Sequence, residues 1–144
     1  MSATLDVNLL LYASDAESKR HERARTFLLD LVAGPQLVVV FWPTLMSYIR
    51  IATHPSIFAR PLTPAVAMGN VQALLDAPTV SVAAEGVRFW ETFTSIAIDA
   101  DARGNLVPDA QLVALMRQHG VRTIWTHDRD FRRFLGIDVR DPFS

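Results

Sequence analysis

Three aspartates lie where apolar segments of the sequence end or begin. Asp6 directly follows the apolar residues 3–5, and Asp128 follows the apolar segment 121–126 with only His127 between them. Asp109 opens a predicted helix after the loop 104–108. The carboxyl ends of parallel strands meet at one edge of a sheet, and Asp109 reaches that edge from its helix N-terminus. The sequence therefore predicts a cluster of three carboxylates.

The helical spacing places two of these acids on apolar faces. Asp109 shares its face with Leu112, Val113 and Met116, and Asp128 shares its face with Phe131 and Leu135. A carboxylate on an apolar face costs several kcal/mol unless something pairs with it, and few basic side chains are placed to do so. Aspartate is also a preferred N-cap, so a simple capping role is the alternative for Asp109 and Asp128. Asp6 has no such alternative.

A divalent cation would compensate the three charges. Mg²⁺ and Mn²⁺ prefer oxygen ligands, and Mg²⁺ keeps several waters beside one or two protein carboxylates. A water with its pKa lowered by the cation is suited to attack a phosphodiester, and two ions roughly 3.5–4 Å apart would brace the attacking and leaving oxygens. Without metal, the clustered carboxylates repel each other, so we expect at least one raised pKa.

Three further polar residues are accessory candidates. Asn8 is placed to orient the Asp6 carboxylate, or it serves local turn chemistry. Thr126 either holds a metal-bound water or simply ends its strand, and the strand interpretation is favoured. Asp130 is within reach of the cluster, but a surface pair with Arg133, three residues on, is favoured for it.

Composition excludes several other classes of function. The 144 residues contain no cysteine, which rules out disulfides, thiol catalysis and thiolate metal sites. The four histidines show no zinc spacing, and there is no GxGxxG, P-loop or GxSxG motif. The net charge of −1, from 14 basic and 15 acidic residues, excludes a polybasic nucleic-acid binder. No apolar run is long enough for a membrane span and the N-terminus lacks a basic signal region, so we expect a cytoplasmic protein.

The elements that must position the acids alternate between strand and helix. Predicted strands cover 3–5, 37–41, 79–82, 121–126 and 137–139. Predicted helices cover 17–32, 43–53, 64–76, 85–97, 109–119 and a short 128–135, and the three prolines in 54–64 indicate a loop. This alternation predicts one α/β domain over 1–144, with a mainly parallel central sheet flanked by helices.

Three segments of the chain resemble the acidic motifs of PIN-domain proteins. They are LDVNLL at 5–10, VPDAQLVAL at 107–115 and THDRDF at 126–131. Their order and the chain length are similar to VapC toxins of type II toxin–antitoxin systems, over nearly the whole chain. The resemblance implies an Mg²⁺- or Mn²⁺-dependent endoribonuclease that acts on structured RNA, forms a homodimer and is inhibited by a VapB-type antitoxin. It makes Asp6, Asp109 and Asp128 the catalytic metal-site acids and Asp130 an accessory residue.

One motif of the family is missing. These proteins usually carry a glutamate in an E-L-R-like stretch on the helix after the second strand. The matching stretch here is Tyr48-Ile49-Arg50, and no acid lies between Asp30 and Asp76. The candidates to replace it are Glu85, Glu91, Asp99 and Asp101. This departure leaves open whether one or two ions bind, and it motivates the alternative of a catalytically inactive PIN-like module that binds RNA or a partner. A small metal-dependent phosphatase is a third hypothesis, but Asp6-Val7-Asn8 lacks the DxD pair of its commonest class.

Contact with RNA would depend on arginines. Arg129, Arg132 and Arg133 cluster beside Asp128, and Arg50 or Arg103 is a candidate for the same cleft. Arginine forks suit phosphate recognition, although the same side chains also serve simply to solubilise a surface. The proline-containing loop 54–64 is a candidate clip for substrate or antitoxin, or only a connection.

Overall fold

The computed structural model describes all residues, 1–144, as one α/β fold built on a five-stranded sheet. The strands are β1 (Ser2–Leu5), β2 (Leu37–Phe41), β3 (Val80–Ala83), β4 (Thr123–Trp125) and β5 (Asp138–Arg140). All neighbouring strands run parallel in the order β3-β2-β1-β4-β5. The predicted α/β class with a parallel central sheet is confirmed.

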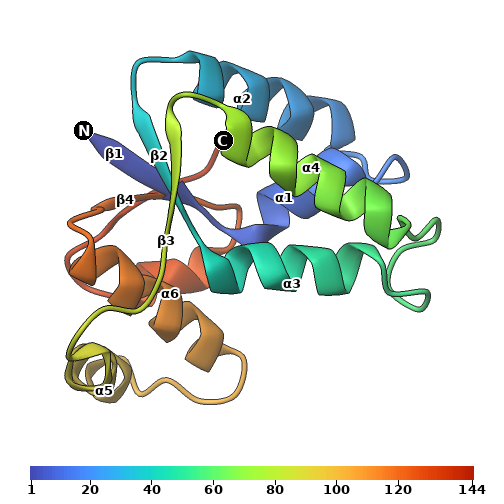
Figure 1. Ribbon diagram of the computed structural model, residues 1–144. Coiled ribbons are helices and arrows are strands. Elements are labelled where there is room, and N and C mark those ends of the chain that lie inside the picture. Colours follow the sequence, from blue (N-terminus) through green and yellow to red (C-terminus); the bar gives the residue numbers. More distant parts are fainter.

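Helices cover both faces of this sheet (Figure 1). They are α1 (Val7–Ser14), α2 (His21–Ala33), α3 (Trp42–Ala52), α4 (Pro64–Asp76), α5 (Phe89–Asp99), α6 (Leu106–Gln118) and the short 3₁₀ helix η1 (Arg129–Arg133). The first four pack against one face around Leu5, Val38 and Leu45. Helices α5 and α6 pack against the other face around Phe41 and Ile124. No helix combines the length and the apolar character needed to cross a bilayer.

The apolar residues of the strands explain this layered arrangement. A parallel strand covered by helices on both faces is apolar along its whole length, and β2 has the sequence LVVVF, in which Val38, Val40 and Phe41 are fully buried. Pro43 begins α3 and Pro64 begins α4, where a proline costs no hydrogen bond. The chain can therefore turn from β2 directly into α3 at the edge of the sheet.

Three predicted helix starts are wrong by three residues or more: the helices predicted to begin at 17, 85 and 109 begin at His21, Phe89 and Leu106. Helix α6 begins at Leu106, not at Asp109, because Pro108 fits within a first turn as well as before it. Asp109 is therefore not an N-cap but lies inside the first turn. The segment after Asp6, to which no helix was assigned, forms α1, and the predicted helix over 17–32 begins only at His21.

The short helix after Asp128 also differs from the prediction. It is a 3₁₀ helix that ends at Arg133, and it buries Phe131 but leaves Leu135 82% exposed. The expectation that Asp128 shares an apolar face with both residues is therefore wrong for Leu135, because a 3₁₀ helix has three residues per turn.

Candidate active site

The acidic residues gather at the point where the strand order changes direction. From β1 the chain adds β2 and β3 on one side and β4 and β5 on the other. Crevices at the carboxyl ends of such strands are where open α/β sheets bind ligands. Asp6 follows β1, and its backbone N–H extends the pairing with β4 by donating to the Trp125 carbonyl at 3.0 Å. Thr126 and Asp128 follow β4 at the same edge.

Asp6 is held by hydrogen bonds in a nearly closed environment. Its residue is only 6% exposed. Its Oδ2 accepts from the Thr126 hydroxyl at 2.9 Å and from the Asn8 side-chain amide at 3.3 Å. Burial raises the pKa of Asp6 to about 6; the bond from Thr126 and the nearby amides of Val7 and Asn8 oppose this shift, and the charge of Asp128 adds to it. The carboxylate is thus oriented but short of compensating positive charge.

Thr126 links Asp6 to Asp128. Its hydroxyl donates to Asp6 and accepts from the backbone N–H of Asp128 at 2.9 Å. Asp128 in turn caps η1, because its Oδ1 accepts from the Asp130 backbone N–H at 2.9 Å. The capping interpretation of Asp128 is therefore correct. Thr126, which is itself as buried as a core residue, does more than end a strand.

Asp109 faces the same group of acids from the first turn of α6. The half-buried Asp109 has its pKa raised to about 7, first by burial and then by the charges of Asp6, Asp128 and Asp130. The charge of each of the other three carboxylates therefore acts on Asp109. The predicted raised pKa is thus present at both Asp6 and Asp109.

No basic side chain forms an ion pair with Asp6, Asp109 or Asp128. No three His, Asp or Glu side chains lie close enough together to enclose an ion, so the aspartates form an open group instead of a closed cage. Such a group of oxygen donors fits Mg²⁺, which keeps several waters and takes one or two protein carboxylates. The assignment of these residues as metal ligands stays a prediction.

The opposite wall of the site is formed by α3. A cleft of about 90 Å³ runs between Asp6 and Asp109 on one side and Pro43, Thr44 and Ser47 on the other. The hydroxyl residues of α3 are absent from the sequence prediction. The signal for them was available: Thr44 and Ser47 are three apart, so they share a helix face, and they lie directly after β2, the strand beside β1.

None of the four acids considered as a replacement for the missing glutamate lines this cleft. Asp101 pairs with Arg103, and Glu85 reaches only as far as Gln111, whose side-chain amide donates to it at 3.1 Å. The favoured surface pair between Asp130 and Arg133 is also wrong, since Arg133 donates instead to the Ala100 carbonyl at 3.4 Å. Asp130 belongs electrostatically to the acidic group.

The predicted RNA-contacting arginines are exposed on η1, the helix that follows Asp128. Arg129, Arg132 and Arg133 are all exposed, and none of them lines the cleft. Arg50 and Arg103 do not line it either. The role of the three η1 arginines in RNA contact stays a prediction.

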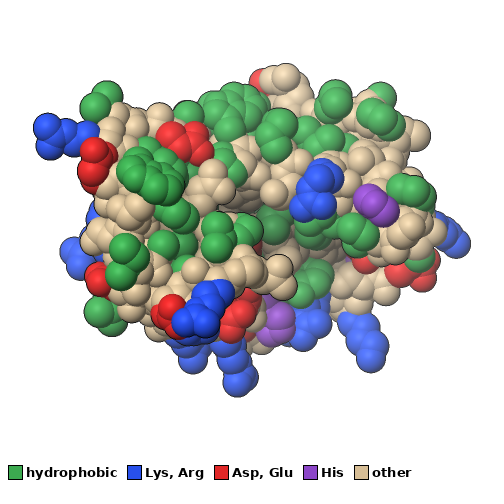
Figure 2. Space-filling model, turned by 90° about the horizontal axis from the view of Figure 1, so that it is seen from below, with side chains coloured by type: hydrophobic (Ala, Val, Ile, Leu, Met, Phe, Trp, Pro, Cys, Tyr) green, Lys and Arg blue, Asp and Glu red, His purple; other side chains and the backbone are tan.

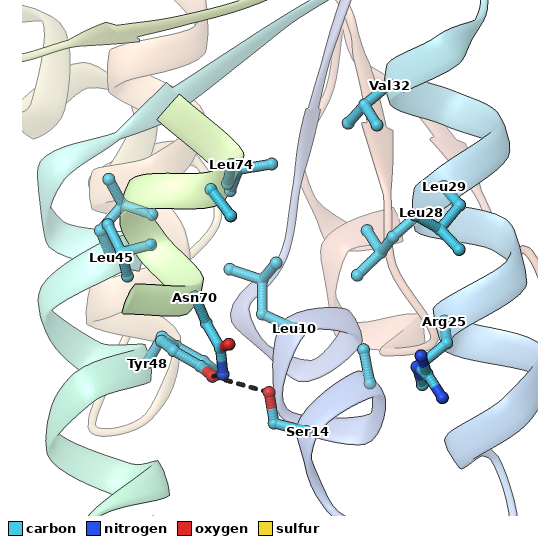
Figure 3. A pocket seen from close by; sticks show the side chains of 13 residues that line it. Leu10, Ser14, Arg25, Leu28, Leu29, Val32, Leu45, Tyr48, Asn70 and Leu74 are labelled. Carbon is cyan, nitrogen blue, oxygen red and sulfur yellow. Dashed lines mark hydrogen bonds between the residues drawn. The ribbon is translucent and has the colours of Figure 1, made fainter. Parts of the chain in front are cut away.

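The largest concave feature of the molecule lies elsewhere, between α1, α2, α3 and α4 (Figure 3). We call this cavity of about 330 Å³ the apolar groove. Ten of its 13 lining residues are hydrophobic, with Leu10, Leu28, Leu45 and Leu74 among them. Figure 3 shows one polar corner, where the Tyr48 hydroxyl meets Ser14 at 2.6 Å and accepts from Asn70 at 3.0 Å. The groove holds no acid and so is separate from the carboxylate site.

A second apolar surface covers α5. Val87, Trp90 and Ile98 are 91%, 69% and 77% exposed, although α5 otherwise packs on α6. Figure 2, which views the molecule from below Figure 1, shows apolar side chains gathered on the side of α5, with charged side chains between and around them. Large exposed apolar side chains in one patch typically mark an interaction surface.

Known proteins are similar to this chain in sequence and in fold. The model of the PIN domain family matches residues 3–135. Ribonuclease VapC48 of Mycobacterium tuberculosis is 47% identical over 144 residues, which cover 100% of this chain and 99% of the relative. Among solved structures, VapBC2 of Rickettsia felis bound to a promoter DNA fragment superposes with a TM-score of 0.71 at 11% identity, covering 98% of each chain. The sarcin–ricin loop cleaving toxin VapC20 of M. tuberculosis superposes with a TM-score of 0.66 at 19% identity, covering 94% of this chain and 98% of that one.

Proposed function

The chain belongs to the PIN-domain family as a VapC-type ribonuclease toxin, and we propose that it is an endoribonuclease that requires Mg²⁺ or Mn²⁺ and cuts structured RNA. The observation that carries the proposal is the convergence of Asp6, Asp109 and Asp128 at one sheet edge without a basic partner. A cation bound there would neutralise the repulsion and act as a Lewis acid that activates water toward a phosphodiester.

The residues of the site have distinct tasks in this proposal. Asp6 is fixed by Thr126 and Asn8, so its free oxygen keeps one direction toward the cleft. Asp128 is fixed by its bond to the Asp130 amide. The Asp109 carboxylate has no hydrogen-bond partner within the protein, so all of its acceptor capacity is available to a ligand. Two hydrogen-bonded carboxylates and one without a partner suit a hydrated cation, because Mg²⁺ takes one or two protein carboxylates and gives up water reluctantly.

The shape of the cleft supports a structured RNA as substrate. Asp6 and Asp109 line a cleft of only about 90 Å³ between α3 and α6. A regular A-form duplex presents its phosphates on a convex surface, whereas loops and bulges present turned-out backbone. A single protruding phosphodiester fits the cleft better, and Arg129, Arg132 and Arg133 would contact neighbouring phosphates.

The apolar groove supports a VapB-type antitoxin as partner. Its walls are four helices and its lining is mostly leucine and valine, which is the surface that receives the apolar face of an amphipathic helix. Arg25 lines the same groove and would pair with an acid at the edge of such a helix. The structural neighbour from R. felis is a VapBC complex. We further propose that the exposed face of α5 joins two copies of this chain in a homodimer.

The proposal is tested with purified protein and a mixture of folded RNAs. Wild-type protein should cleave in Mg²⁺ or Mn²⁺ and stop in EDTA. Asp6→Asn and Asp109→Asn should each lose cleavage by a factor of about a hundred or more, as removal of a single electrostatic element of a site typically does. Asp30→Asn, an exposed acid on α2, is the matched control. Undiminished cleavage in EDTA would refute the proposal. Absence of Mn²⁺ binding by calorimetry would instead favour a non-catalytic PIN-like module.

A further inference from the structure

The α3 wall of the cleft combines two features that suit an anion. The first is the N-terminus of an 11-residue helix, α3, which begins at Trp42 and whose N-cap residue, Phe41, offers no side-chain cap. The N–H groups of a first helical turn lack partners within the helix, and the helix dipole adds partial positive charge there. Pro43, which has no N–H, and Thr44 line the cleft from this first turn.

The second feature is a threonine hydroxyl without a partner on a side chain that is itself almost entirely buried. Thr44 is only 7% exposed as a residue, it lines the cleft, and no hydrogen bond within the protein involves its hydroxyl. Threonine in a helix commonly bonds back to the carbonyl four residues earlier, and Thr53 at the other end of α3 does so with Ile49 at 2.7 Å. The hydroxyl of Thr44 keeps both its donor and its acceptor capacity, and only the cleft gives access to it. A ligand that enters the cleft can therefore bind it.

The two walls of the cleft are electrostatically opposite. Asp6 and Asp109 line one side, whereas the α3 side carries the hydroxyls of Thr44 and Ser47 and no acid. A phosphodiester has two non-bridging oxygens. One can face a cation on the acidic wall while the other accepts from hydroxyl groups and helix N–H groups on the opposite wall. A carboxylate on the α3 wall would repel that second oxygen.

We propose that Thr44, Ser47 and the N-terminus of α3 form a binding site for a non-bridging oxygen of the RNA phosphodiester, on the helix where the resemblance to VapC toxins leads one to expect an acid. This inference rests on the proposed ribonuclease function. It means that the chain recognises the phosphate through neutral donors, and that the acidic wall alone holds the cation.

The test measures the two ligands separately in three variants. Thr44→Val keeps the shape and removes the hydroxyl, Ser47→Ala removes the second hydroxyl, and Thr53→Val removes a hydroxyl from the far end of the same helix as the control. Binding of inorganic phosphate in the presence of Mg²⁺ is followed by ³¹P NMR, and binding of Mn²⁺ without phosphate is followed by calorimetry.

Thr44→Val should weaken phosphate binding by about tenfold or more, since hydrogen bonds to charged groups contribute about 1.5–3 kcal/mol. Ser47→Ala should weaken it less, and Thr53→Val should not change it. The Mn²⁺ affinity should stay within about twofold in all three variants, because in this proposal the hydroxyls donate to the phosphate and do not contact the cation. The melting temperature of Thr44→Val should not fall, since the hydroxyl has no partner to lose.

Two results would overturn the proposed phosphate-binding site. The first is an unchanged phosphate affinity in Thr44→Val, and the second is a loss of Mn²⁺ affinity in that variant, which would assign the hydroxyl to the cation. Failure of the ribonuclease proposal gives a different pattern. Wild-type protein would then leave RNA intact, while phosphate binding and its loss in Thr44→Val would persist.

Discussion

Replacement of Asp109 by asparagine should stabilise the metal-free protein at alkaline pH. Burial and the charges of Asp6, Asp128 and Asp130 raise the pKa of Asp109 from 3.8 to about 7. Between these two pH values the folded protein binds more protons than the unfolded chain, so the free energy of unfolding falls as pH rises through this window. Above about pH 7 the wild-type protein carries the full cost of the ionised group. Asparagine removes the charge and keeps the size of the side chain.

The magnitude follows from the size of the shift. One pKa unit corresponds to about 1.4 kcal/mol, so a shift from 3.8 to about 7 has an upper limit of about 4 kcal/mol. Asp109 is half-buried, so solvent screens part of this cost, and part is shared with Asp6, which titrates in the same region. We therefore expect a gain of about 1–2 kcal/mol at about pH 8, which raises the melting temperature by roughly 2–8 °C for a chain of this size.

The assay is thermal and urea unfolding in EDTA at about pH 5 and about pH 8. The advantage of Asp109→Asn should shrink markedly at the lower pH, where much of the wild-type carboxyl is already protonated. Excess Mg²⁺ should reverse the order, because a bound ion stabilises wild-type protein by about 2.7 kcal/mol at a concentration a hundred times its Kd. Asp30→Asn is the surface control. If Asp109→Asn were less stable than wild type at about pH 8 in EDTA, the repulsion between Asp109 and the neighbouring carboxylates would be refuted.

Three further substitutions probe other parts of the molecule. Thr126→Val should lower the free energy of unfolding by about 1–3 kcal/mol in urea titrations, because it removes one hydrogen bond from the buried Asp6 and leaves the Asp128 amide without its partner; an unchanged value would show that this link is unimportant. Leu29→Glu, at a groove residue that is 63% exposed, should weaken binding of a VapB-type antitoxin by about tenfold or more in calorimetry while RNA cleavage persists; equal affinity would place the antitoxin elsewhere. Trp90→Glu on α5 should convert a dimer into a monomer in analytical ultracentrifugation, and a dimer that survives would exclude this face.

The alternation of apolar runs and helical periods was sufficient to predict the α/β class and the parallel sheet. Strand β2 was predicted with its observed bounds because a buried parallel strand is apolar throughout, and α4 because a proline begins it and another follows it. The edge position of Asp6 and Asp128 followed from the same reasoning, since both residues come within two positions of the carboxyl end of a predicted strand.

Other features depended on tertiary contacts that no local pattern encodes. The segment Val7–Ser14 is apolar in almost every position, so it shows no helical period, and only packing against α2 and α3 makes it a helix. The cleft wall at Thr44 was missed for a related reason. A single threonine in an apolar helix is ordinary in sequence. Its significance lies in an unpaired hydroxyl that lines the same cleft as Asp6 and Asp109, which come from other elements of the fold.

The near-neutral net charge of −1 hides an asymmetry that matters for RNA. Asp6 and Asp109 line a narrow cleft without basic partners, whereas Arg129, Arg132 and Arg133 are exposed beside it. In the proposed function, an RNA strand that approaches without a cation would be repelled by the two carboxylates at the site of the reaction. Only the arginines outside the cleft would attract it. In the proposed function, binding and cutting are therefore separable by the cation: the arginines would bind phosphates at any metal concentration, while entry of one phosphodiester into the cleft would require a positive charge that the chain itself does not supply.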